Sequence, residues 1–101
     1  MKWILALSMF WTLPTEPKPL TLQEVAEIRV KYMADHNYRW HPPYSIGRPW
    51  QHGARFEGCG FGAKNRDPKT LGTCRPRRRL ALAADAVATG KFGTYRLRLW
   101  K

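Results

Sequence analysis

His41 and Glu57 are the two residues of this chain whose types and spacing best suit chemistry. They lie sixteen residues apart, and Glu57 begins the segment Glu57-Gly58-Cys59-Gly60-Phe61-Gly62. An imidazole and a carboxylate that meet in one cleft can exchange protons or bind a divalent metal. Catalytic zinc sites use about three protein ligands, so this pair alone predicts only a weak metal site. The alternative for Glu57 is an ion pair with Arg55 or with an arginine of the run 75–79.

Other features give little support to an enzyme. The chain has few serines and no Gly-x-Ser-x-Gly nucleophile elbow. Its glycine-rich segment predicts a bulge or tight turn with positive φ, because a phosphate-binding loop should open a helix and the sequence after Gly62 does not. His36, His41 and His52 match no standard spacing of metal ligands, and loop histidines usually form hydrogen bonds only. These patterns favour binding over catalysis and leave a metal-assisted hydrolase as an alternative.

Cys59 and Cys74 are the only cysteines. An even pair in a small exported chain predicts a disulfide. Closing this loop would stabilise the fold by about 3 kcal/mol in the chain-entropy model. Two free thiols in a cytosolic protein are the alternative. A zinc finger is not indicated, because the chain has no Cys-x-x-Cys pair.

The N-terminal segment resembles an export signal. Residues 1–13 carry a lysine followed by an apolar run, which is too short to cross a bilayer as a helix because that needs about 20 apolar residues. The proline-rich residues 14–19 predict an extended linker, and residues 20–101 then form a single small domain. These features indicate a secreted or cell-envelope protein. The alternative is an N-terminal strand or arm packed on the domain.

Positive charge is concentrated in the C-terminal part of the chain. Residues 1–63 carry seven Lys/Arg against five Asp/Glu, whereas residues 64–101 carry eleven against two. Such a charge distribution attracts polyanions such as acidic envelope polymers, anionic lipids and nucleic acids. The arginines expected to contact the polyanion are Arg75, Arg77, Arg78, Arg79, Arg96 and Arg98.

The residues that follow the linker predict an amphipathic helix over Leu22–Asp35. Thr21 and Glu24 have the spacing of a capping box, and apolar residues recur on one side of the expected helix. Prolines make residues 36–53 an ordered loop. Its aromatic residues are expected to pack in the core or the loop rather than to form a ligand platform. They are Trp40, Tyr44 and Trp50.

The last segment predicts a β-hairpin. Apolar and basic residues alternate over Thr94–Trp100, which is typical of a half-buried strand. Leu80–Ala88 is rich in alanine and could form a helix, but the glycine-bounded turn before the strand favours the first arm of a hairpin. The expected fold class is α+β, with the N-terminal helix packed on a small antiparallel sheet that ends in this hairpin.

The order of these parts resembles bacterial members of the CAP superfamily, the cysteine-rich secretory, antigen 5 and pathogenesis-related (SCP-like) proteins. Tyr32-Met33-Ala34 resembles the turn that ends the family's helix, and His41 follows at the family's distance. Glu57–Gly62 is similar to its Gly-Glu-Asn-like motif with the glycine-rich continuation. The strands over residues 86–100 resemble its final strands.

The resemblance implies that His41 and Glu57 are half of the family's His/Glu cleft, which binds a divalent metal in some members. The chain departs from the family pattern in lacking a counterpart of the second glutamate. Thr73-Cys74-Arg75-Pro76-Arg77 takes the place of the family's Ser-Pro-Gly-His-Arg motif. The region of the second cleft helix is shortened as well.

The sequence supports two hypotheses for the function of this protein. The first is a small exported CAP-like binding domain that acts at the cell surface or outside the cell, with its basic face on an anionic polymer or membrane. The second is an intracellular or phage-borne nucleic-acid-binding protein that uses Arg75–Arg79, Arg96 and Arg98. No small-molecule cofactor is indicated, and a divalent metal at His41 and Glu57 is a weaker expectation.

Overall fold

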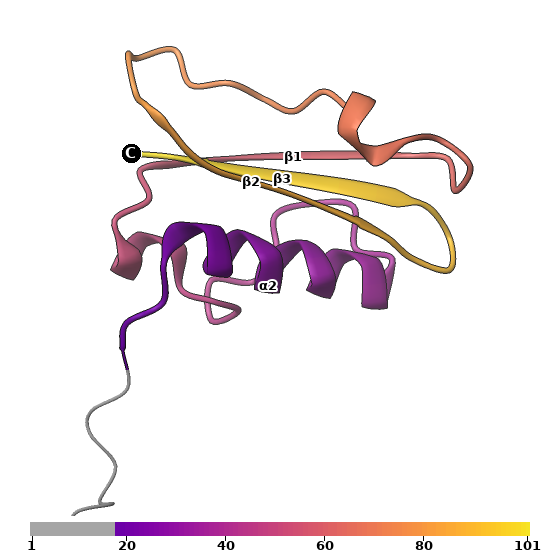
Figure 1. Ribbon diagram of the computed structural model, residues 1–101, viewed down its shortest axis with the longest axis horizontal. Coiled ribbons are helices and arrows are strands. Elements are labelled where there is room, and N and C mark those ends of the chain that lie inside the picture. Colours follow the sequence, from indigo (N-terminus) through magenta and orange to yellow (C-terminus); the bar gives the residue numbers. More distant parts are fainter. Residues whose placement is uncertain (1–17) are drawn as a thin grey trace, which may run out of the picture.

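The computed structural model describes residues 18–101, so the expected export segment 1–13 and most of the linker 14–19 lie outside the described residues (Figure 1). No helix in this described range is long and apolar enough to cross a membrane. Residues 18–101 form one long helix, two short 3₁₀ helices and three strands: α2 (Leu22–His36), η1 (Pro49–His52), β1 (Phe56–Gly62), η2 (Pro68–Thr70), β2 (Leu82–Thr89) and β3 (Thr94–Trp100).

Helix α2 begins at the predicted capping box. The Thr21 hydroxyl accepts a hydrogen bond from the Glu24 amide at 3.1 Å, and the Thr21 amide donates to the Glu24 carboxylate at 2.8 Å. The helix ends at His36, because the next residue, the C-cap Asn37, has a left-handed backbone with φ of 49°. The predicted helix is therefore confirmed to within one residue at its C-terminal end.

The three strands form one antiparallel sheet in the order β1-β3-β2. Strands β2 and β3 make the predicted hairpin, so Leu82–Thr89 is a strand and not a helix despite its alanines. Strand β1 pairs with the other edge of β3, with Glu57 opposite Leu99 and Cys59 opposite Leu97. The predicted α+β fold class is confirmed.

Helix α2 packs on one face of this sheet, while the segment between β1 and β2 passes along the other face (Figure 1). Because side chains alternate along a strand, Glu57 and Cys59 of β1 point to the same face as Leu97 and Leu99 of β3. That face is the core face. Its buried apolar residues are Val25, Ala26, Val30, Met33, Ala34, Ala54, Ala84, Ala86, Tyr95, Leu97 and Leu99.

The glycines of β1 lie on the opposite face, where the chain between η2 and β2 comes very close. A Cβ atom on Gly58 would lie 2.3 Å from the Cys74 carbonyl oxygen, and one on Gly60 would lie 2.1 Å from that of Gly72. The expectation of positive φ at these glycines is wrong, because within residues 18–101 the positive-φ glycines are Gly47 and Gly53. Glycine is needed in β1 because another backbone packs directly on the strand.

Candidate functional site

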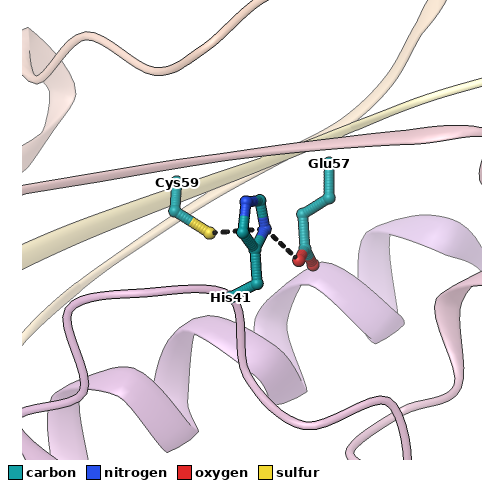
Figure 2. Close-up of side chains that lie close together, drawn as sticks. All are labelled: His41, Glu57 and Cys59. Carbon is teal, nitrogen blue, oxygen red and sulfur yellow. Dashed lines mark hydrogen bonds and ion pairs between the residues drawn. The ribbon is translucent and has the colours of Figure 1, made fainter.

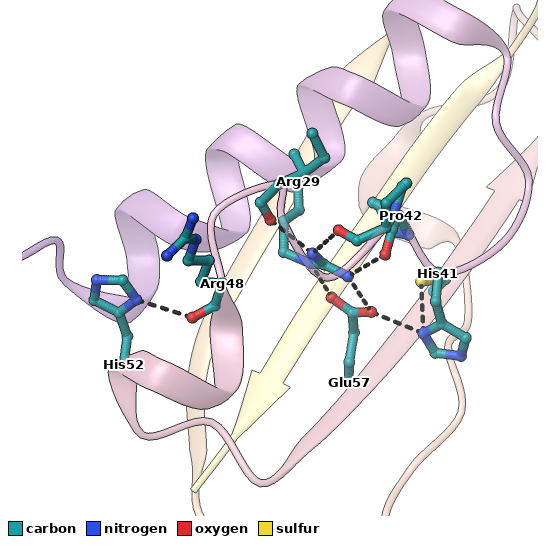
Figure 3. Close-up of polar contacts among 9 residues, drawn as sticks. Arg29, His41, Pro42, Arg48, His52 and Glu57 are labelled. Atoms are coloured by element: carbon teal, nitrogen blue, oxygen red, sulfur yellow. Dashed lines mark hydrogen bonds and ion pairs between the residues drawn. The ribbon is translucent and has the colours of Figure 1, made fainter.

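A buried ion pair between Arg29 and Glu57 forms the base of the site. Arg29 points from helix α2 toward the sheet and Glu57 points from β1 toward the helix (Figure 3). Arg29 Nη2 donates to Glu57 Oε1 at 2.9 Å and Nε donates to Oε2, and each side chain is only 2% exposed. Glu57 therefore pairs with the helix, and the expected alternative pairing with Arg55 or the run 75–79 is wrong.

The remaining N–H groups of Arg29 bind the loop that follows the helix. Nη2 donates to the carbonyl of Pro42 at 2.8 Å, and Nη1 donates to those of Pro43 at 3.0 Å and Ile46 at 2.7 Å. A guanidinium carries five N–H donors, and all five of Arg29 are now satisfied. One buried side chain thus joins α2, β1 and the loop that carries His41.

His41 lies over Glu57 at the start of this fixed loop. Its Nδ1 is 2.8 Å from Glu57 Oε1, and its side chain is 39% exposed (Figures 2 and 3). The carboxylate can only accept, so Nδ1 carries the proton that it donates. In the neutral ring this leaves the lone pair on Nε2, the nitrogen turned away from Glu57 in Figure 3. The predicted proximity of His41 and Glu57 is confirmed.

Cys59 completes a cluster with these two residues. Its Sγ is 3.5 Å from His41 Nδ1, and one ligand atom from each of His41, Glu57 and Cys59 lies within 4.8 Å of the others (Figure 2). These groups are already engaged with one another. Both Glu57 oxygens accept from Arg29, and burial, followed by the charge of Glu57, raises the pKa of the Cys59 thiol to about 12, so a metal would have to displace the Arg29 hydrogen bonds and the thiol proton.

A pocket of about 470 Å³ opens above the His41–Glu57 pair. Tyr44 and Trp50, at its wall, are half exposed, and Trp40, at 68% exposure, contacts the His41 ring edge to face with 5.1 Å between ring centroids, so the three rings lie in the loop and not in the core. Aromatic rings next to an oriented polar group are the usual composition of a binding pocket. The lining residues are Arg29, His41, Pro42, Tyr44, Pro49, Trp50, Arg55, Phe56, Glu57 and Cys74.

The structure does not contain the predicted disulfide, because Cys59 and Cys74 are both free thiols. The reason lies in the strand geometry. Cys59 points to the helix side of β1, toward His41, whereas the carbonyl of Cys74 packs against Gly58 on the opposite side. The side chain of Cys59 and the backbone carbonyl of Cys74 therefore lie on opposite faces of β1.

The arginines expected to contact a polyanion divide into two groups. Arg75, Arg77, Arg78 and Arg79 are exposed. Arg96 lies against the sheet, where it holds Asp85 through Nε and Nη2 and donates through Nη1 to the carbonyls of Lys69 and Leu71. Arg96 therefore fixes η2 to the sheet. Arg98 lies beside it and is only 12% exposed.

The other two histidines stay outside the site. Nδ1 of His36 lies 3.0 Å from the Tyr32 carbonyl, and Nδ1 of His52 lies 3.0 Å from that of Arg48 (Figure 3). His52 thus forms the local hydrogen bond that the sequence predicts for a loop histidine, whereas His36 is the last residue of α2 and bonds within the helix.

Arg29 is the residue of the site that the sequence interpretation missed. A usable signal exists, because Arg29 is four residues after Val25 and four before Met33, and so lies on the buried face of the helix. A charged residue on that stripe requires a buried partner of opposite charge. Among the carboxylates of the chain, Glu57 is the buried one within residues 18–101.

The chain matches no protein-family model, no curated protein and no solved structure in comparisons with each. The resemblance to the CAP superfamily therefore stays a prediction that rests on the motifs around His41 and Glu57.

Proposed function

We propose that this protein is a small CAP-like binding domain that acts at the cell surface or outside the cell. The pocket beside His41 takes one group of an anionic polymer, and the exposed arginines of the run 75–79 contact the rest. The observation that carries this proposal is the fully hydrogen-bonded Arg29–Glu57 pair, which holds a half-exposed imidazole at an aromatic pocket. Such pre-organisation lowers the entropy lost on binding.

Binding fits the pocket better than catalysis. Glu57 uses both oxygens to hold Arg29 and His41, so it is an orienting group and not a free base. Cys59 stays protonated because burial raises its pKa to about 12, so this thiol is not available as a nucleophile. His41 presents its ring Nε2 at this pocket, together with the Arg55 guanidinium and the exposed Cys74 thiol.

The pocket and the basic run are continuous. Cys74 lines the pocket and Arg75 follows it in the chain, while Arg55 lines the same pocket. A polymer that lies along the arginines can therefore place one substituent against Tyr44 and Trp50. The ligand group we infer has an apolar or ring face for these aromatics and a hydrogen-bond donor for His41 Nε2.

The test uses purified poly(glycerol phosphate) teichoic acid with sugar substituents as the probe, because the sugar supplies both the ring face and the hydroxyl donor that the pocket is inferred to bind. We expect the indole N–H resonance of Trp50 and the backbone amides of the run 75–79 to shift together and saturably. Affinity should fall steeply with salt, because phosphate contacts release counterions. His41→Ala should abolish the Trp50 shift, whereas His36→Ala, an exposed histidine outside the site, should leave it unchanged.

Two results would count against the proposal. One is an unchanged Trp50 resonance at saturating polymer. The other is tighter binding of a DNA duplex than of teichoic acid at equal phosphate concentration and equal salt, which would favour the nucleic-acid-binding alternative carried by the same exposed arginines.

A further inference from the structure

The sheet face opposite helix α2 carries a second cluster of charge. Asp85 on β2 lies opposite Arg98 on β3, and Arg96 is two residues before Arg98 on the same strand. Arg96 takes both oxygens of Asp85, with Nε to Oδ1 at 2.9 Å and Nη2 to Oδ2 at 2.6 Å. The carboxylate of this cluster is therefore committed to Arg96.

Nε of Arg98 is left without a hydrogen-bond acceptor among residues 18–101. This nitrogen is buried and stands 3.7 Å from Asp85 Oδ2. A buried donor without an acceptor costs about 1–3 kcal/mol, and more when it is charged. The contrast with Arg29 is direct, because that buried guanidinium has all five donors satisfied in the same small fold.

Arg75 adds a third positive charge to this cluster. The carbonyl of Cys74 packs on Gly58, and Gly58 is the register partner of Arg98, so the next residue, Arg75, lies near Arg98. The pKa of Arg98 is lowered, first by burial and then by the positive charges of Arg96 and Arg75. Arg98 thus lies between the positive charges of Arg96 and Arg75, with Asp85 as the carboxylate on its other side, so the cluster has an excess of two positive charges.

We propose that Arg98 and Arg75 form a discrete oxyanion site, on the face of the sheet opposite helix α2, that binds one phosphate group. A phosphate monoester or inorganic phosphate carries a charge of about −1.5 to −2 at neutral pH, which matches the local excess. The phosphate oxygens accept charge-assisted hydrogen bonds from the planar guanidinium groups, and one oxygen accepts the hydrogen bond of Arg98 Nε–H. The bound group links the exposed run 75–79 to β3.

This site does not depend on the pocket. The pocket is built around Glu57 and His41 on the helix side of β1, whereas Arg98 lies on the other side of the sheet. The two proposals share Arg75, so their outcomes are told apart by the readout, which is the Trp50 indole for the pocket and the Arg98 Nε–H for the phosphate site.

Inorganic phosphate is the probe for this site, titrated at constant ionic strength against chloride. The readout is the Nε–H resonance of Arg98, assigned by its disappearance in Arg98→Lys. We expect a saturable shift of this resonance in the wild-type protein and no shift of the Arg29 Nε–H. Arg98→Lys keeps the positive charge but loses the planar set of guanidinium N–H donors, so phosphate should bind about tenfold more weakly.

Arg75→Gln and Lys91→Gln form a matched pair, since both remove one positive charge and Lys91 lies in the distant β2–β3 turn. Arg75→Gln should weaken phosphate binding while Lys91→Gln should not. An Arg98 Nε–H that does not move in millimolar phosphate would overturn the proposal, and so would equal weakening by the two variants. The wild-type titration keeps the test decisive if Arg98→Lys fails to fold.

Discussion

Arg29 and Glu57 form a two-point ion pair between the helix and the edge strand of the sheet, and the same guanidinium holds three carbonyls of the loop after His41. The position of the imidazole therefore depends on a residue that does not touch it. His41 is fixed by Glu57, Glu57 by Arg29, and the loop by Arg29 as well. A site whose orienting groups are themselves held by buried hydrogen bonds keeps its geometry without a ligand.

Removal of Arg29 should be strongly destabilising. Arg29→Met leaves the Glu57 carboxylate buried without its partner and frees three loop carbonyls. Breaking one side of a buried pair typically costs about 3–5 kcal/mol. We expect a loss of this size in the free energy of unfolding, measured by urea denaturation.

Two further variants make this measurement specific. Arg29→Met with Glu57→Leu removes both charges and should recover part of the loss. Lys31→Ala breaks the exposed Lys31–Asp35 pair and should cost less than about 1 kcal/mol. Equal losses in Arg29→Met and Lys31→Ala would contradict the role assigned to the buried pair.

Asp85 should make stability depend on pH in acid. Hydrogen bonds from Arg96 are the main cause that lowers the pKa of Asp85 in the folded protein. The unfolded chain, with a carboxyl pKa of about 3.9, then binds the proton more readily than the folded one. The stabilisation from Asp85 is therefore present above about pH 4 and is lost as the pH falls through the lower, folded-state value.

The measurement compares urea unfolding of the wild-type protein and Asp85→Asn from neutral pH into acid. The wild-type free energy of unfolding should fall more steeply below about pH 4 than that of the variant. Asp35→Asn, at the exposed pair with Lys31, should leave the wild-type slope nearly unchanged. Parallel curves for the wild type and Asp85→Asn would show that Arg96 does not stabilise the ionised form.

Gly58 should not tolerate a side chain. The Cβ of Gly58→Ala would meet the Cys74 carbonyl oxygen at 2.3 Å, so the strand or the segment must shift. Overpacking of this kind costs about 1–3 kcal/mol. Gly72→Ala is the control, because no atom lies within 4 Å of its Cβ position. Thermal unfolding compares the two variants, and Gly58→Ala should melt at the lower temperature. Equal melting temperatures would mean that the chain between η2 and β2 does not pack on β1.

Local patterns predicted the parts of the fold that depend on neighbouring residues. The capping box at Thr21 and Glu24 specifies where α2 begins, because the hydrogen bonds involved span three residues. The alternation of apolar and basic residues over Thr94–Trp100 specifies β3, because this pattern also depends only on residues close together in the sequence. The pairing of His41 with Glu57 was accessible as a hypothesis because both residue types and their spacing are visible in the sequence.

Contacts between distant segments could not be predicted in this way. The glycines of β1 are explained by the backbone at Gly72 and Cys74, which the sequence does not place next to the strand. The helical spacing places Arg29 on the buried face of α2, but it does not identify the partner, Glu57, which lies 28 positions away. The cysteines suggested a disulfide from their number, but strand alternation directs Cys59 toward His41 instead.

The two thiols should differ sharply in reactivity. Cys74 is exposed, whereas burial raises the pKa of Cys59 to about 12, and alkylation requires the thiolate. We expect the native protein to take up one iodoacetamide at Cys74 near neutral pH, and a second at Cys59 only after unfolding in urea, as counted by mass spectrometry without reductant. Cys74→Ser should remove the fast reaction and keep the slow one. Modification of neither cysteine after unfolding would contradict the free thiols and restore the disulfide, whereas equal rates in the native protein would show that Cys59 is not shielded beneath His41.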